Sequence, residues 1–110
     1  MTIVDYTTAG GKNVIETYLN RLPDKERLKA YQIRQRISED GMVALASINT
    51  RQLQGKLWEI KFFANRIMYI VKDGDSIYFL HACKKQKGKA EIFELDKAIS
   101  RAKSAGLKVD

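Results

Sequence analysis

The sequence has little cysteine, little proline and no long apolar run. Its single cysteine, Cys83, cannot form an internal disulfide. No apolar stretch approaches the length of a membrane span, and residues 1–8 lack the apolar centre of a secretory signal. These absences argue against a disulfide-stabilised secreted domain and against a membrane protein. The expected compartment is therefore the cytoplasm.

Basic residues exceed acidic ones, and the excess is uneven along the chain. The formal net charge is +7, from 20 Lys and Arg against 13 Asp and Glu. Residues 1–40 hold seven basic and six acidic residues, whereas residues 41–110 hold thirteen and seven. A surplus concentrated in one part of the chain attracts a polyanion, and nucleic acid is favoured because no basic amphipathic membrane anchor is present. The length of 110 residues suits one domain, residues 1–110.

The first part of the chain predicts one short strand and two helices. Residues 2–6 form the strand, at an edge or opening position, and residues 14–22 and 25–39 form the helices. Asn13 and Asp24 are the expected N-caps. Because only a Leu-Pro-Asp corner separates the two helices, they are predicted to form a helical hairpin. Residues 42–55 predict no regular element.

The second part predicts three strands and a closing helix. Alternating apolar residues place strands at 57–63, 66–72 and 76–83, joined by turns at Ala64-Asn65 and at residues 73–75. An apolar stripe predicts a helix over residues 90–105, and its members are Ile92, Leu95, Ala98, Ile99 and Ala102. The expected fold class is α+β: a small antiparallel sheet packed on the N-terminal helical hairpin, with a closing C-terminal helix.

Strand alternation predicts which side chains share a face. A turn at Ala64-Asn65 pairs Phe63 with Arg66 and Lys61 with Met68. One face is then apolar and is expected to be core, with Trp58 as an anchor: Trp58, Ile60, Phe62, Ile67, Tyr69 and Val71. The opposite, open face carries Glu59, Lys61, Phe63, Arg66, Met68 and Lys72.

The third strand can be placed in two ways. A two- or four-residue loop puts Ile77, Phe79, His81 and Cys83 on the open face and Tyr78, Leu80 and Ala82 on the core face. A three-residue loop with a bulge reverses this assignment. Under the first arrangement Lys61, Arg66 and His81 converge at one end of the open face, next to the basic segment 84–89. Their convergence favours a functional site over its plain alternatives, which are solubilising charges, a structural histidine and a solvated basic loop.

Residues 13–99 resemble the RelE/HigB superfamily of toxins, especially its phage-derived branch. The resemblance is carried by LQGKLWEI at 53–60, by NRI at 65–67, and by Leu80-His81 followed by Lys84-Lys85. It implies a RelE-like fold and a ribosome-dependent endoribonuclease that cuts messenger RNA without a metal or other cofactor. It also implies an antitoxin, often a helix-turn-helix protein from the same operon, that binds the toxin in a hetero-oligomer. The expected partners are this antitoxin, the ribosome and mRNA, with no membrane.

The resemblance also suggests roles for individual residues. Lys61 matches a basic residue used on the substrate, Arg66 matches the arginine used on the scissile phosphate, and Lys84 or Lys85 matches a basic residue at the end of the last strand. The expected catalytic set is Lys61, Arg66, His81 and Lys85, and the expected RNA-binding set is Arg51, Lys56, Lys84, Lys87 and Lys89. No metal-ligating set is expected, and Cys83 is interpreted as a packing residue.

Two departures leave the general base unassigned. Residues 84–90 read KKQKGKA, where many relatives have Lys-Lys-x-x-Lys-Thr-Pro, and residues 106–110 lack the tyrosine that acts near the end of some members. His81 is the first candidate base because its ordinary pKa suits proton transfer at neutral pH, although its role in this branch could be structural. A non-catalytic RNA- or protein-binding module on the same scaffold stays open as the alternative. A DNA-binding regulator is disfavoured because no recognition helix is evident.

Overall fold

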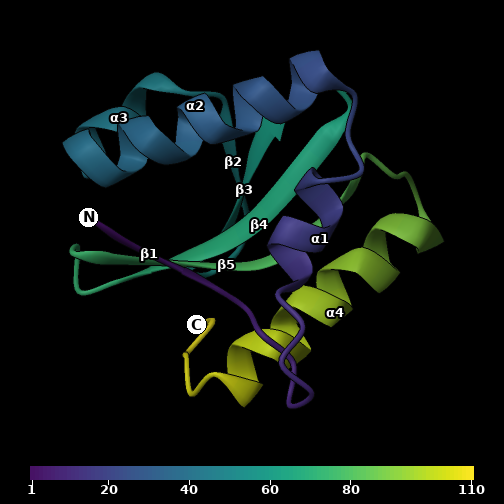
Figure 1. Cartoon of the computed structure of the whole chain (residues 1–110). Helices are drawn as coiled ribbons and strands as arrows, with labels where there is room; N and C mark the ends of the chain where they lie inside the picture. Colours follow the sequence, from purple (N-terminus) through teal and green to yellow (C-terminus); the bar gives the residue numbers. More distant parts are fainter.

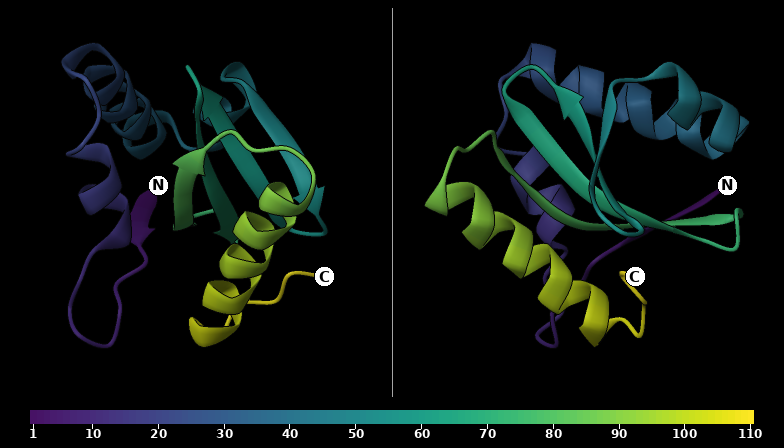
Figure 2. Two further views of the ribbon diagram at one scale, coloured as in Figure 1. Left: turned by 90° about the vertical axis from the view of Figure 1, so that its right-hand side faces the viewer. Right: turned by 180° about the vertical axis from the view of Figure 1, so that it is seen from behind.

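The computed structural model describes all 110 residues, and it places a five-stranded sheet between two layers of helices (Figure 1). The elements in chain order are β1 (Thr2–Asp5), α1 (Val14–Leu19), α2 (Asp24–Asp40), α3 (Met42–Ser47), β2 (Thr50–Gln54), β3 (Leu57–Phe62), β4 (Asn65–Lys72), β5 (Ser76–Lys84) and α4 (Lys89–Ser104). Helices α1 to α3 cover one face of the sheet and α4 covers the other (Figure 2). The predicted α+β class is confirmed.

The sheet is mixed rather than wholly antiparallel, which corrects the prediction. Its strand order is β1-β5-β4-β3-β2, and β1 runs parallel to β5 while the other neighbours are antiparallel. The predicted edge position of β1 is confirmed. Helix α2 holds this edge strand through a two-bond ion pair, in which Arg34 Nη1 and Nη2 donate to the Asp5 carboxylate at 2.8 and 3.0 Å.

The helix starts follow the local capping chemistry. The Asn13 Oδ1 accepts hydrogen bonds from the backbone N–H groups of Ile15 and Glu16, so the predicted N-cap of α1 is confirmed. The second prediction is wrong by one residue, because Pro23 is the N-cap of α2 and Asp24 is its first residue. Helices α1 and α2 follow one another across the same face, where α1 packs mainly on β5 and α2 packs on α3, β1 and β3. They do not form a closely packed hairpin.

Two elements lie in residues 42–55, where the sequence predicted none. Helix α3 has only six residues, which is too short to show a helical period. Strand β2 reads TRQLQ, a polar sequence without alternation, and it pairs with β3 at the edge of the sheet. The sequence does not predict α3 and β2, because these elements are stabilised by packing on their neighbours rather than by a local pattern of residues.

The β3–β4 turn lies one residue earlier than predicted. Lys61 pairs with Arg66 and Phe62 with Asn65, so the turn is Phe63-Ala64. Asn65 is fully buried, and its side-chain amide forms hydrogen bonds with Tyr18, Glu26 and Lys84. These bonds hold Asn65 in the strand, because an exposed turn position would break them. The partner of Arg66 changes from Phe63 to Lys61, a shift of two residues. An even shift keeps every side chain on its side of the sheet, so the predicted faces of β3 and β4 are unchanged.

Strand β5 follows the predicted faces only in its second half. Its hairpin with β4 has the three-residue loop 73–75, so Ile77 pairs with Val71 and, like Phe79, packs on the face covered by α1 to α3. A bulge at Leu80 then restores the first parity, and His81 pairs with Met68. The predicted sides of Ile77, Phe79, Tyr78 and Leu80 are therefore wrong. Those of His81, Ala82 and Cys83 are confirmed.

The face predicted to be open is covered by α4 and the C-terminal tail. These elements bury a second apolar core: Leu57, Met68, Ile70, Leu80, Cys83, Ala98, Ala102, Leu107 and Val109. Cys83 is thus confirmed as a packing residue. Ile92, predicted in the stripe of α4, is exposed because the first turns of this helix extend beyond the core.

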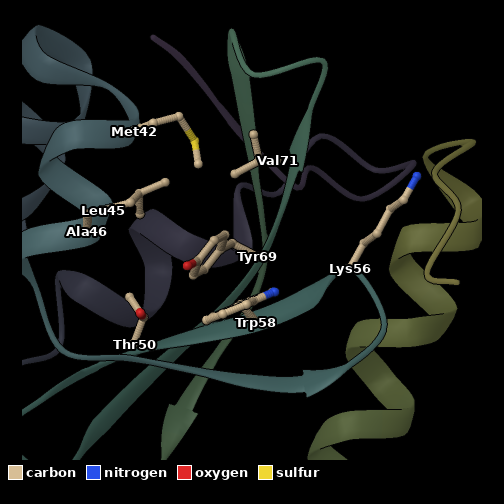
Figure 3. Close-up of a pocket in the computed structure, with 8 residues that line it drawn as sticks. All are labelled: Met42, Leu45, Ala46, Thr50, Lys56, Trp58, Tyr69 and Val71. Atoms are coloured by element: carbon tan, nitrogen blue, oxygen red, sulfur yellow. The ribbon is translucent and has the colours of Figure 1, made fainter.

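Trp58 is not the predicted core anchor, since it is 37% exposed. It lies in an apolar groove of about 360 Å³ between α3 and the sheet (Figure 3). The groove is lined by Met42, Leu45, Ala46, Thr50, Lys56, Trp58, Tyr69 and Val71. Helices α1 to α3 cover only part of their sheet face, which leaves this end of β3 and β4 accessible.

Candidate active site

A basic cleft of about 240 Å³ opens where β3, β4 and the end of β5 meet α4. Six basic and three acidic side chains line it together with three others. The lining residues are Arg51, Glu59, Lys61, Arg66, Met68, Cys83, Lys84, Lys85, Gln86, Lys87, Glu91 and Glu94. We call this hollow the basic cleft, because its excess of cations suits a polyanion.

The structure gathers most of the predicted site residues in the basic cleft. They are Lys61, Arg66, Lys85, Arg51, Lys84 and Lys87. Three predicted residues lie elsewhere. Lys56 stands at the opposite end of β3 beside the apolar groove, and Lys89 is exposed on the first turn of α4. His81 is only 6% exposed and does not line the basic cleft.

Arg66 is a partly buried cation held by its own turn. Its side chain is 17% exposed, and Nη1 donates to the Asn65 carbonyl at 2.8 Å. The Nε atom lies 3.9 Å from Glu59 Oε2. Nη1 and Nε have these protein contacts and Nη2 has none, so Nη2 is the group best placed to meet a phosphate oxygen.

Glu59 is a buried carboxylate between two arginines. Its side chain is 3% exposed, and Oε2 lies 2.9 Å from Arg51 Nε in an ion pair that lacks hydrogen-bond geometry, so this oxygen accepts no hydrogen bond. Arg51 Nη2 also donates to Glu91 at 2.8 Å, and this bond is the main cause of a raised pKa for Arg51. Glu59 therefore places a buried negative charge beside Arg51 and Arg66 in the wall of the cleft.

Asn65 anchors the Lys84 side of the cleft. Lys84 Nζ donates to Asn65 Oδ1 at 2.8 Å and lies 3.7 Å from Glu26. Tyr18 donates its hydroxyl to the same Oδ1 at 2.7 Å, and burial raises the pKa of Tyr18 to about 12, so the hydroxyl stays a donor. This network ties α1 and α2 to the strand ends that carry the site.

A second polar network lies beneath α4. Arg101 Nη1 donates to the Leu80 carbonyl at 3.1 Å and lies 2.9 Å from His81 Nδ1. On the other side of the ring, His81 Nε2 lies 2.5 Å from Glu94 Oε2. Since an arginine can only donate, Nδ1 must accept and Nε2 must carry the proton.

The pKa values in this network agree with that tautomer. Burial lowers the pKa of His81, and the neighbouring Arg101 and Lys97 lower it further against the opposing effect of Glu94. Burial also raises the pKa of Glu94, but hydrogen bonds from His81 and Cys83 outweigh it and leave that pKa below the ordinary value. At neutral pH the network thus holds a neutral imidazole and an ionised carboxylate.

A comparison with protein families gives one match. The model of the Gp49-like phage-derived protein family (DUF891) matches residues 17–103. The chain belongs to this family. The family is a RelE/HigB-like toxin family, so the resemblance found in the sequence is confirmed at the level of the family. Every residue lining the basic cleft of this Gp49-like protein lies inside the matched segment.

No curated protein matches this Gp49-like chain. No helix in the structure combines the length and apolarity needed to cross a membrane.

One side-chain cluster has the composition of a metal site. Donor atoms of His81, Cys83 and Glu94 lie within 4.8 Å of one another. In the tautomer that Arg101 requires, however, neither ring nitrogen of His81 has a free lone pair, because Nε2 carries a proton and Nδ1 accepts from Arg101. Burial raises the pKa of the Cys83 thiol to about 12, so the thiol also stays protonated. The arrangement therefore fits a hydrogen-bond network better than a metal site.

Sequence reasoning missed three residues of this region: Glu59, Glu94 and Arg101. Glu59 was placed on the correct face, but alternation says nothing about its burial between two arginines. Glu94 and Arg101 flank the apolar stripe of α4, and the sequence does not say which face of the sheet this stripe covers. Helix α4 packs on the sheet face that carries Lys61, and only this packing brings Glu94 and Arg101 into the region.

Proposed function

We propose that this Gp49-like protein is the toxin of a toxin–antitoxin pair and that its basic cleft cleaves mRNA on the ribosome. The observation that supports this most strongly is the setting of Arg66. This partly buried guanidinium shares one cleft with Lys61 and Lys85 and with ionisable carboxylates. Metal-independent RNA cleavage requires a base that takes the 2′-hydroxyl proton, cations that stabilise the phosphorane, and an acid that protonates the leaving oxygen. The carboxylates and cations of this cleft offer all three.

The proposed reaction is an attack of a ribose 2′-hydroxyl on the adjacent phosphate. A bond forms between the 2′ oxygen and phosphorus, and the bond from phosphorus to the 5′ oxygen breaks. The products are a 2′,3′-cyclic phosphate and a free 5′-hydroxyl. Arg66 donates from Nη2 to a phosphate oxygen as negative charge builds on it, while Nη1 stays bonded to the Asn65 carbonyl.

The surrounding cations have supporting roles. Lys61 and Lys85 add positive charge, and an ammonium group of this pair protonates the leaving 5′ oxygen. Arg51, Lys84 and Lys87 bind neighbouring phosphates, and Lys89 extends the basic surface along α4. Lys56 lies apart from the cleft and contributes charge at a distance. The ribosome supplies the alignment of the RNA, so a modest cleft suffices.

The proposed partners follow from this activity. The toxin acts in the cytoplasm, where it meets translating ribosomes and mRNA. An antitoxin, expected to be a helix-turn-helix protein from the same operon, neutralises it by binding in a hetero-oligomer. Acidic side chains are expected where the antitoxin meets the basic cleft, because the cleft has an excess of cations.

The test compares the wild-type protein with Arg66→Ala on ribosomes translating a defined mRNA. We expect the wild type to cut the mRNA and Arg66→Ala to lose about 10²–10³-fold in rate, the usual effect of removing one transition-state donor. Lys72→Ala is the matched control, because it removes an exposed cation from the same strand. A wild-type protein that binds ribosomes and leaves the mRNA intact would instead indicate a non-catalytic RNA-binding module.

A further inference from the structure

The geometry points to Glu94 as the proton acceptor of the basic cleft, with His81 and Arg101 as the residues that position it. This inference rests on the proposed nuclease function and fills the one role that the sequence left unassigned. It replaces His81 as the candidate base, because His81 is buried and reaches the cleft only through Glu94.

Burial separates Glu94 from Glu59, and the nature of the bonded partner separates it from Glu91. The Glu94 side chain is 25% exposed, so a ribose hydroxyl can reach it, whereas Glu59 is almost fully buried between Arg51 and Arg66. Glu91 is more exposed, but it is paired at 2.8 Å with Arg51, a permanent cation that disfavours uptake of a proton. Glu94 combines access from the cleft with an orientation fixed by an uncharged ring.

The orientation of Glu94 is built in two steps. Arg101 Nη1 bonds to the carbonyl of Leu80, the bulge residue of β5, and also to His81 Nδ1. This contact forces the proton of the neutral ring onto Nε2, which donates to Glu94 Oε2 at 2.5 Å. Because the ring holds Oε2, we assign the proton of the 2′-hydroxyl to the second carboxylate oxygen, Oε1.

The proton balance of the step is complete without a cofactor. Glu94 Oε1 takes the proton of the 2′-hydroxyl as the 2′ oxygen bonds to phosphorus. A lysine ammonium of the cleft gives a proton to the leaving 5′ oxygen. After the products leave, Glu94 returns its proton to water and the lysine regains one. His81 stays neutral throughout and keeps its Nε2 proton.

A first experiment tests the positioning network without any assay of activity. Nitrogen-15 NMR of the full-length protein at pH 7 reports the tautomer of His81, the only histidine in the chain. We expect the Nε2–H tautomer in the wild type and a mixture of tautomers in Arg101→Ala, which removes the donor at Nδ1. A wild-type ring that is protonated on Nδ1 would overturn the positioning roles.

A second experiment tests the role of Glu94 in cleavage on the ribosome. Glu94→Gln keeps an oxygen that accepts from His81 but cannot take a proton, and we expect a loss of about 10²–10⁴-fold in the cleavage rate. Asp96→Asn, an exposed charge on the same helix, is the matched control and should cut at the wild-type rate. Binding to ribosomes and thermal unfolding of each variant are measured alongside.

The His81 variants separate positioning from general support of the fold. His81→Gln can donate near the Nε2 position, so it should retain most of the cleavage rate. His81→Phe fills the space without donating and should lose roughly 10–100-fold. If the wild type cuts and Glu94→Gln cuts equally fast, the assignment of Glu94 is wrong and the nuclease function stands. If the wild type does not cut, the proposed function itself fails.

Discussion

A lone histidine illustrates how a residue's environment decides its chemistry. From its type alone, His81 is the natural candidate for proton transfer at neutral pH. In the structure its ring is buried, and Arg101 and Glu94 occupy both nitrogens. His81 is therefore a fixed hydrogen-bond donor, and in our proposal Glu94 is the residue that accepts and releases a proton.

The lowered pKa of His81 makes the stability of the fold depend on pH. Above the ordinary value of 6.5 the ring is neutral in both the folded and the unfolded chain. As the pH falls through 6.5, the unfolded chain takes up a proton that the folded chain resists, because burial, Arg101 and Lys97 oppose it despite Glu94. The free energy of unfolding should therefore decrease on acidification, by at most ~1.4 kcal/mol per pH unit from this group.

Urea denaturation at about pH 7 and about pH 5.5 measures this effect. His81→Gln has no ring to titrate and should show a smaller decrease than the wild type over the same interval. The lowered pKa of Glu94 adds to the decrease only nearer its ordinary value of 4.5, so the two contributions are separable. Equal decreases in both proteins would mean that His81 titrates alike in the folded and unfolded states.

Turns and bulges determine which strand predictions succeed. Alternation correctly assigned the faces of β3 and β4, because their apolar residues repeat every second position. It failed in the middle of β5, where a three-residue loop and the bulge at Leu80 each shift the parity by one. The two shifts cancel before His81. A single strand's sequence does not show a bulge, since the bulge depends on the partner strand and on the Arg101 contact.

Gly55, within the LQGKLWEI segment, is the turn residue with the strictest requirement. It has a positive φ of 55°, and an added Cβ would lie 2.1 Å from the Val109 carbonyl oxygen of the C-terminal tail. That same carbonyl accepts a hydrogen bond from the Lys56 backbone at 2.5 Å. The tail must therefore move if any side chain replaces Gly55.

Gly55→Ala should accordingly cost more than backbone strain alone. Gly74 has a positive φ of 75° with open space around it, so Gly74→Ala measures the strain by itself, about 1 kcal/mol. Gly55→Ala adds the steric overlap and should lose roughly 3 kcal/mol in total. Chemical denaturation of both variants gives the comparison. Equal losses would show that the tail does not hold the β2–β3 turn.

At the scale of the whole molecule, the basic cleft exists because two layers meet. Helix α4 lies against the sheet (Figure 2). The sheet supplies Lys61 and Arg66, whereas α4 supplies Glu94. The order of elements from β3 to α4 was predictable from the sequence, as were most of the cations. The contribution of α4 was not, because an apolar stripe does not identify the sheet face that it covers. The carboxylates that α4 brings to the cleft, Glu91 and Glu94, were consequently not predicted as site residues.

The docking of α4 should therefore control both stability and cleavage. Ala98 is fully buried in the second core, and Ala98→Leu adds volume where there is no space. We expect a loss of about 1–3 kcal/mol in the free energy of unfolding and a reduced cleavage rate, since Glu94 moves relative to Arg66. Ala90→Leu, on the exposed first turn of the same helix, should change neither. Full cleavage by a destabilised Ala98→Leu protein would show that the position of α4 is unimportant.

The central claim is that the basic cleft cuts RNA by attack of the 2′-hydroxyl. The most direct measurement is the chemistry of the ends formed when the purified protein acts on mRNA in reconstituted translating ribosomes. We expect a 2′,3′-cyclic phosphate and a 5′-hydroxyl with the wild type, and intact mRNA with Arg66→Ala over the same time. Intact mRNA with the wild type, equal cutting by both proteins, or a 3′-hydroxyl and 5′-phosphate pair would contradict the proposed mechanism.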